Sequence, residues 1–206
     1  KLYPDLRTFL ETAAKDNPRL RLALDAHVSL AFAAGSIINI KSGRQVEIEQ
    51  RSTGRRIWAA DDMAPDPSWP MLAAESVELR PDQPHLAVAL GLTHDVSADV
   101  RRYCESTLAS VGRLLILKPT TGAGAQSVAG GRHAFELADA ATHAVRSAMA
   151  DGKGLVHLFI AAPNAFTFFL GQRQAVLGRV RLYEFDFDGG RGRSYAPALT
   201  LPPGLS

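Results

Sequence analysis

The segment His85-Leu-Ala-Val-Ala-Leu-Gly-Leu92 is a continuous apolar run that leads into Thr93-His94-Asp95. Such a run is typical of a strand that is buried on both faces of a parallel sheet. A second run, His157-Leu-Phe-Ile-Ala-Ala162, leads into Pro163-Asn164, and a helical pattern follows each run. Strands that alternate with helices in this way predict an α/β fold with largely parallel sheets.

The same alternation extends over most of the chain. Helices are expected over residues 3–15, 28–38, 97–110, 132–150 and 164–176, and strands over 20–25, 45–50, 55–60, 113–118, 155–161 and 180–187. The turn Ser52-Thr-Gly54 is expected to join two of these strands. Five prolines between Asp61 and Pro84 predict a long, stiff loop with only a short element inside it.

The two apolar runs also suggest an internal repeat. Each leads through a short polar turn into a helix and then into another strand, near Leu114 and Val180. Any α/β chain produces some likeness of this kind by chance, so duplication and coincidence both stay open.

Composition excludes several classes of protein. The 206 residues hold 23 Lys+Arg and 21 Asp+Glu, a formal net charge of +2, which argues against a duplex-DNA reader held by phosphate contacts. The single cysteine, Cys104, excludes a disulfide framework and a Cys-rich zinc site. No apolar run reaches the roughly 18 residues that a membrane span needs.

The usual motifs of catalysis are absent from the sequence. It contains no P-loop, no HExxH pair and no Gly-x-Ser-x-Gly elbow. Thr121-Gly-Ala-Gly-Ala-Gln-Ser127 resembles a dinucleotide fingerprint, but serine stands where the third glycine is required. The acids at Asp61-Asp62 and at Asp186 and Asp188 are expected to be solvated rather than metal ligands. A binding module without cofactor or metal is therefore favoured, and a nucleotide hydrolase on a Rossmann-like sheet is the alternative.

Three strand ends are candidates for binding an anion, because a strand that turns into a helix presents backbone amides there. They are Thr93-His94-Asp95, Gly130-Gly131-Arg132 and Pro163-Asn164-Ala165. For the first and third, a plain helix cap is the competing interpretation, and for the glycine loop it is an ordinary surface loop.

The side chains around these ends define the candidate site. Arg132 is suited to a phosphate, and the tryptophans that flank the proline-rich loop are suited to stacking on a base, although both fit an edge-of-core anchor as well. Lys41, after an apolar helix, is a further phosphate candidate. The full candidate set is Lys41, Trp58, Trp69, Thr93, His94, Thr120, Thr121, Gly122, Gln126, Gly131, Arg132, Pro163, Asn164 and Phe166.

Several segments together resemble one known family. They are His157-Leu-Phe-Ile-Ala-Ala-Pro-Asn-Ala-Phe166, Leu170-Gly-Gln172, Val180-Arg-Leu-Tyr-Glu-Phe185 and Tyr195-Ala-Pro-Ala-Leu-Thr-Leu-Pro202, with Leu24-Asp-Ala-His27, Ala33-Ala-Gly35 and Leu86-Ala-Val-Ala-Leu90 upstream. From about residue 20 onward the chain is similar to a SAVED domain, the cyclic-oligonucleotide sensor of bacterial antiphage (CBASS) effectors.

The resemblance implies a fold of two fused CARF-like, Rossmann-type halves, about 20–118 and 119–206, after an N-terminal linker helix over 1–19. It implies a ligand between the halves, with a cyclic dinucleotide favoured and a trinucleotide possible. The chain is most similar to the sensor of HNH-SAVED endonucleases.

The same resemblance implies a role in the bacterial cytoplasm. A non-catalytic sensor of this family would activate a fused effector, an HNH-type nuclease, by ligand-driven self-association. It would bind neither membrane nor DNA directly. A ring nuclease that cleaves its own ligand is the enzymatic alternative.

Overall fold

The computed structural model describes residues 2–51, 54–149, 154–187 and 194–204. Its strands are β1 (Arg19–Ala23), β2 (Gln45–Arg51), β3 (Arg55–Trp58), β4 (Leu72–Glu78), β5 (His85–Gly91), β6 (Val111–Pro119), β7 (Val156–Ala161), β8 (Val180–Phe185) and β9 (Tyr195–Leu201). Its helices are α1 (Leu2–Lys15), α2 (Val28–Ile37), the 3-10 turn η1 (Ile40–Ser42), α3 (Ser97–Thr107), α4 (Gly131–Ala148), α5 (Asn164–Gly171) and α6 (Gln174–Leu177). The α/β class predicted from sequence is confirmed.

The strands form two sheets. The larger sheet has the order β4-β6-β5-β7-β8-β9 and the smaller one the order β1-β2-β3. The inner pairs β6-β5, β5-β7 and β7-β8 are parallel, and so is β1-β2. Antiparallel strands β4, β9 and β3 add to the edges. The sheets are therefore parallel at their centres and mixed at their margins.

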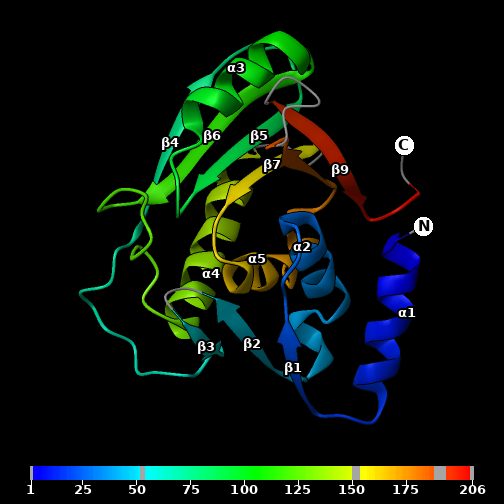
Figure 1. Cartoon of the computed structure of the whole chain (residues 1–206). Helices are drawn as coiled ribbons and strands as arrows, with labels where there is room; N and C mark the ends of the chain where they lie inside the picture. The colour runs from blue at the N-terminus through cyan, green and yellow to red at the C-terminus, as the bar shows by residue number, and fades with distance from the viewer. Residues whose placement is uncertain (1, 52–53, 150–153, 188–193, 205–206) are drawn as a thin grey trace.

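Helices cover both faces of the six-stranded sheet, as Figure 1 shows. On β5, Leu86, Val88 and Leu90 join the core on the side of α4 and α5, whereas Ala87 and Ala89 pack with Val100 and Cys104 of α3. Burial on both faces explains why this strand reads as an uninterrupted apolar run.

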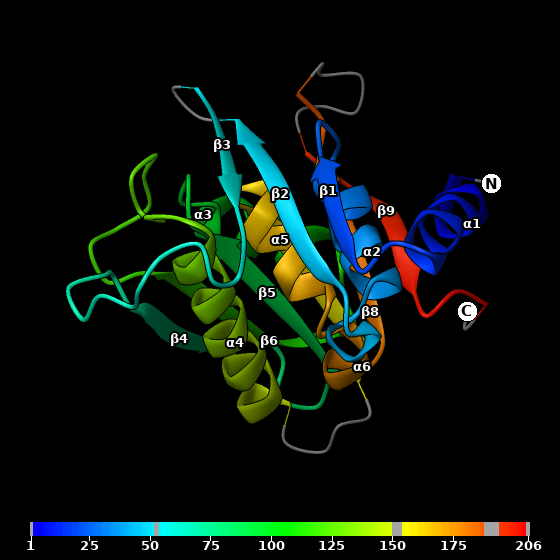
Figure 2. The ribbon, with the colours of Figure 1, turned by 90° about the horizontal axis from the view of Figure 1, so that it is seen from below.

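Helices α2 and α5 cross at very short range and join the two sheets (Figure 2). A Cβ atom on Gly35 of α2 would lie 2.0 Å from the Phe168 carbonyl oxygen of α5. In return, a Cβ atom on Gly171 of α5 would lie 2.1 Å from the Phe32 carbonyl oxygen of α2. The sequences Phe32-Ala-Ala-Gly35 and Phe168-Phe-Leu-Gly171 therefore make the same contact from both sides.

A similar exchange of contacts occurs at the N-termini of α2 and α5. The Ser29 amide of α2 donates to the Glu184 carboxylate of β8 over 2.8 Å, across 155 residues of chain. The Ala165 amide of α5 donates to the Gln50 side-chain oxygen of β2 over 3.2 Å, across 115 residues. We therefore distinguish an N-terminal unit (β1, α2, β2, β3) and a C-terminal unit (β7, α5, β8, β9), each of which caps the other's helix.

The proline-rich stretch contains a short element, as predicted, which is strand β4 in a full antiparallel ladder along β6. One helix differs from the sequence-based expectation. The helix predicted over 164–176 is divided into α5 and α6. Arg173 leaves helical geometry there (φ −102°, ψ 9°), and the side-chain amide of Gln172 donates to the Ile38 carbonyl at the end of α2 over 2.9 Å.

Other bounds agree within a few residues. The closing stretch forms β9, and β8 ends at Phe185 rather than at residue 187. The expected turn residues Ser52 and Thr53 lie outside the described residues. Within the described part of the chain, no helix combines the length and the apolar character that crossing a bilayer requires.

Candidate ligand-binding site

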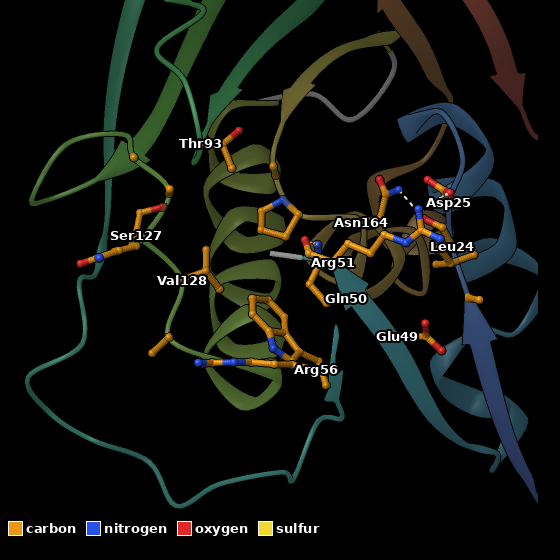
Figure 3. A pocket seen from close by; sticks show the side chains of 18 residues that line it. Leu24, Asp25, Glu49, Gln50, Arg51, Arg56, Thr93, Ser127, Val128 and Asn164 are labelled. Atoms are coloured by element: carbon orange, nitrogen blue, oxygen red, sulfur yellow. Dashed lines mark hydrogen bonds and ion pairs between the residues drawn. The ribbon is translucent and has the colours of Figure 1, made fainter. Parts of the chain in front are cut away.

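A cavity of about 810 Å³ opens where strands of both sheets end (Figure 3). Its volume lies in the upper part of the range for small-molecule sites. Its lining comes from the segments after β1, β5, β6 and β7 and from the β2-β3 hairpin. The lining residues are Ala23, Leu24, Asp25, Glu49, Gln50, Arg51, Arg56, Trp58, Thr93, Gly124, Ala125, Gln126, Ser127, Val128, Ala129, Ala162, Pro163 and Asn164.

The topology of the large sheet explains this position. The chain leaves β5 toward β6 on one side and leaves β7 toward β8 on the other, although β5 and β7 are neighbours. The connections after two such strands diverge and leave a crevice at their carboxyl ends. Thr93 follows β5 and Pro163 follows β7, and both line the cavity.

Charged side chains of the cavity come from the N-terminal unit. Arg51 Nη1 lies 2.7 Å from Asp25 Oδ2, so that an ion pair joins the ends of β2 and β1. Glu49 is paired with Arg55 over 3.2 Å. Arg56 lines the cavity, and its guanidinium has no hydrogen-bond or ion-pair partner among the described residues.

The C-terminal unit supplies an uncharged wall. The Asn164 side-chain amide donates to the carbonyls of Leu24 (2.7 Å) and Ala26 (2.9 Å), which fixes the start of α5 against the end of β1. Because the amide nitrogen is used in these bonds, the Asn164 side-chain oxygen is the group that faces other partners.

The glycine-rich loop is held in place by hydrogen bonds to the end of β5 and to α4. The Gly124 amide (2.9 Å) and the Ser127 hydroxyl (2.6 Å) both donate to the Leu92 carbonyl at the end of β5. The Ala129 amide donates to His133 Nδ1 over 3.1 Å. The loop therefore forms a defined wall of the cavity, and Gln126 is exposed on it.

His133 connects this wall to the proline-rich stretch. Its Nε2 lies 2.9 Å from the Pro70 carbonyl, and the Trp69 ring stacks on the imidazole at a centroid distance of 4.9 Å. Burial lowers the pKa of His133 and favours the neutral ring that this arrangement needs, with Nδ1 as acceptor and Nε2 as donor. Trp69 thus packs outside the cavity.

The N-terminus of α4 is already occupied by a side chain. Both oxygens of the Asp62 carboxylate accept there, from the amides of Gly131 (2.8 Å) and Arg132 (2.8 Å). The Arg132 guanidinium turns along the helix to Glu136, 2.7 Å away. A carboxylate from the chain itself therefore fills the position at which the sequence suggested a phosphate.

Of the fourteen candidate residues, the structure brings five into the cavity: Trp58, Thr93, Gln126, Pro163 and Asn164. Phe166 is fully buried in the core, and Lys41 is exposed on η1. His94 is exposed, with Nδ1 3.1 Å from its neighbour Thr93 Oγ1. Thr120, Thr121 and Gly122 are exposed near the end of β6 and, like Trp69, Gly131 and Arg132, do not line the cavity.

Sequence analysis missed the β2-β3 hairpin as a wall of the site. A signal was nevertheless present, because residues two apart in a strand share a face. Arg56 therefore shares a face with Trp58, which was a candidate, and it pairs across the hairpin with Gln50. Arg56 could have been identified from the sequence, because it lies two residues before the candidate Trp58 on the same face of a predicted strand.

Comparison with known proteins agrees with this architecture. Residues 2–201 match the SAVED family, described as the SMODS-associated and fused to various effectors sensor domain. CD-NTase-associated protein 4 of Enterobacter hormaechei subsp. hoffmannii is 33% identical over 201 residues. That alignment covers 97% of this chain and 40% of the relative, so the chain spans less than half of the relative's length.

Solved structures with the same fold are Cap4 SAVED/CARF-domain containing receptors. The Acinetobacter baumannii receptor with the cyclic trinucleotide 3'3'3'-cAAA has a TM-score of 0.72 at 20% identity, over 97% of this chain and 44% of that one. The Moraxella osloensis receptor has a TM-score of 0.67 at 19% identity, over 97% and 41%. Since the family match spans nearly all of the sequence, the chain belongs to the SAVED family of sensor domains.

Proposed function

We propose that this chain is a sensor module that binds a cyclic oligonucleotide in the cavity between its two sheets. The observation that carries the proposal is the cavity itself, which combines Arg56, whose side chain has no partner in the described part of the chain, with Trp58 and uncharged hydrogen-bonding groups. Arginine suits phosphate, and aromatic rings suit bases. Structures of the same fold with bound cyclic trinucleotides support it.

Ring size is part of this proposal. The family resemblance favoured a cyclic dinucleotide, whereas the Acinetobacter baumannii receptor has structures with the cyclic trinucleotides 2'3'3'-cAAA and 3'3'3'-cAAA. A volume of about 810 Å³ leaves room for more than a single nucleotide. We propose a cyclic trinucleotide as the first ligand to test, with cyclic dinucleotides beside it.

The proposal extends to the longer protein. Because this chain spans 40% of its relative, we propose that a fused effector, an endonuclease in the first instance, is controlled by ligand-driven self-association in the bacterial cytoplasm. Helix α1 lies within residues 1–19, the stretch proposed as the linker. Light scattering of the intact effector should show a larger mass with saturating ligand, and an unchanged mass contradicts assembly.

Ligand binding is tested by calorimetry with a panel of cyclic di- and trinucleotides. At least one should bind with a dissociation constant in the micromolar range or below, which corresponds to about 8 kcal/mol. Chromatography of the ligand after incubation separates a sensor from a ring nuclease, because a sensor returns it intact. No heat and no thermal shift with any member of the panel would overturn the proposal.

A further inference from the structure

The charged residues that line the cavity differ in whether they already form an ion pair within the protein. Among the residues that the structure describes, four charged side chains line the cavity, and three of them, Asp25, Glu49 and Arg51, already take part in ion pairs. Arg56 is the remaining one. Arg51 and Asp25 are both exposed, with 59% and 72% of their side-chain surface accessible, so their ion pair is solvated. An exposed ion pair of this kind contributes little to stability, so exchanging its carboxylate for another anion costs little.

The two arginines reach in different directions. Figure 3 shows Arg56 extending from β3 toward the side of the cavity that carries Val128. Arg51, from the end of β2, extends the other way to Asp25. Two cations on opposite sides suit a ligand that presents phosphates at separate points of its outline.

Building on the proposed function, we infer that Arg56 and Arg51 are the phosphate-binding residues of the cavity. Arg56 binds one phosphate directly, because no side chain or carbonyl of the described residues is bonded to its guanidinium. Arg51 binds a second phosphate when the ligand displaces Asp25 from its guanidinium. Both contacts use the planar fork of arginine, which matches two oxygens of a phosphate.

This assignment gives Asp25 an opposing role. Its carboxylate occupies Arg51 and adds a negative charge beside the ligand's phosphates. Removing that charge frees Arg51 without removing any contact to the ligand. Affinity should therefore increase on substitution of Asp25, which a purely structural ion pair would not produce.

The test is the dissociation constant for 3'3'3'-cAAA, measured by calorimetry on the whole chain. Arg56→Ala should weaken binding about 10- to 100-fold. It should also make the affinity less dependent on salt concentration, because one charge–charge contact between the protein and the ligand is lost. Arg56→Lys keeps the charge and should lose less affinity.

Arg132→Ala is the matched control. This arginine also belonged to the candidate set, but its guanidinium is paired with Glu136 and does not line the cavity. The affinity of the Arg132→Ala variant for 3'3'3'-cAAA should stay within about twofold of that of the parent chain. A large loss in Arg132→Ala with little change in Arg56→Ala would overturn the assignment.

Asp25→Asn completes the test. It should strengthen binding about two- to fivefold, which corresponds to the modest free energy of an exposed ion pair. Weaker or unchanged binding in Asp25→Asn contradicts the displacement of Asp25. If the parent chain binds no cyclic oligonucleotide, the proposed function fails; if it binds and Arg56→Ala matches it in affinity and salt dependence, only this inference fails.

Discussion

The N-terminal and C-terminal units have the same order of helices and strands but differ in how deeply their first strands are buried. Both run strand, helix, parallel strand and antiparallel strand, and their helices meet through the same Phe-x-x-Gly contact. Yet β1 is at most half-buried, whereas β7 is largely buried at the centre of the six-stranded sheet. The charged residues that line the cavity, within the described part of the chain, belong to or closely follow strands of the N-terminal unit, and the C-terminal unit contributes Ala162, Pro163 and Asn164. One arrangement of elements thus provides a rigid support in one unit and ligand chemistry in the other.

The largest loss of stability is expected from substitutions that force α2 and α5 apart. Gly35→Val and Gly171→Val each place side-chain atoms where a backbone carbonyl already lies, within 2.0–2.1 Å of the new Cβ. Backbone cannot move aside as a flexible side chain does, so each substitution should lower the free energy of unfolding by about 3 kcal/mol or more.

Urea denaturation followed by circular dichroism measures this loss. Gly54→Ala is the control, because nothing lies within 4 Å of a Cβ atom at that position. If either valine variant is as stable as the control, the close contact between α2 and α5 is wrong.

Acid should act on the C-terminal unit, because its strand β7 carries the buried His157, whereas the corresponding strand β1 of the N-terminal unit carries no histidine. His157 Nδ1 lies 2.7 Å from the Tyr183 hydroxyl and Nε2 lies 3.2 Å from His85 Nδ1. Burial, and then His85 and Arg181, lower the pKa of His157 to about 4. The unfolded chain, with a histidine pKa near 6.5, takes up the proton first.

Stability from this group is therefore complete above about pH 6.5 and falls as the pH drops toward 4, by up to about 3 kcal/mol. Unfolding free energies measured between pH 7 and pH 4 should show this decrease. His157→Phe should flatten the decrease, and His143→Gln, at a position with 80% of the side chain exposed, should retain it. A parent chain with the same stability at both pH values would contradict the low pKa.

A smaller difference should separate the two reciprocal caps. Glu184 presents a carboxylate to the N-terminus of α2, and Gln50 presents a neutral oxygen to that of α5. A charge at a helix N-terminus stabilises more than a neutral acceptor. Glu184→Ala should therefore cost about 1–2 kcal/mol and Gln50→Ala about 0.5–1 kcal/mol in thermal denaturation. Equal losses would mean that charge plays no part in the asymmetry.

The sequence predicted best where burial decided the structure. The apolar runs at residues 85–92 and 157–162 lie on β5 and β7 because a strand covered on both faces has no room for polar side chains. Thr93 and Pro163 were located from the same runs, since a residue that follows such a strand lies at the sheet's carboxyl edge.

Local sequence patterns could not predict side-chain positions that depend on contacts with residues far away in the sequence. The N-terminus of α4 had every feature of an anion site, but Asp62, about 70 residues earlier, reaches it first. Trp69 was assigned to the ligand because it flanks the loop, and it stacks instead on His133. Arg51 and Arg56 lie at the cavity because the β2-β3 hairpin is pinned to α5 through Gln50, a contact that no sequence period encodes.

The reciprocal contact between Gly35 and Gly171 has a consequence for synthesis on the ribosome. The N-terminal unit is made first, but the helix against which it packs belongs to the last third of the chain. Contacts between such distant segments form late, because the intervening chain must be closed into a loop before they contribute. We therefore expect the six-stranded sheet to assemble around α5 first. The arginine-bearing hairpin then docks last, so that a ligand pocket exists only on a completed molecule.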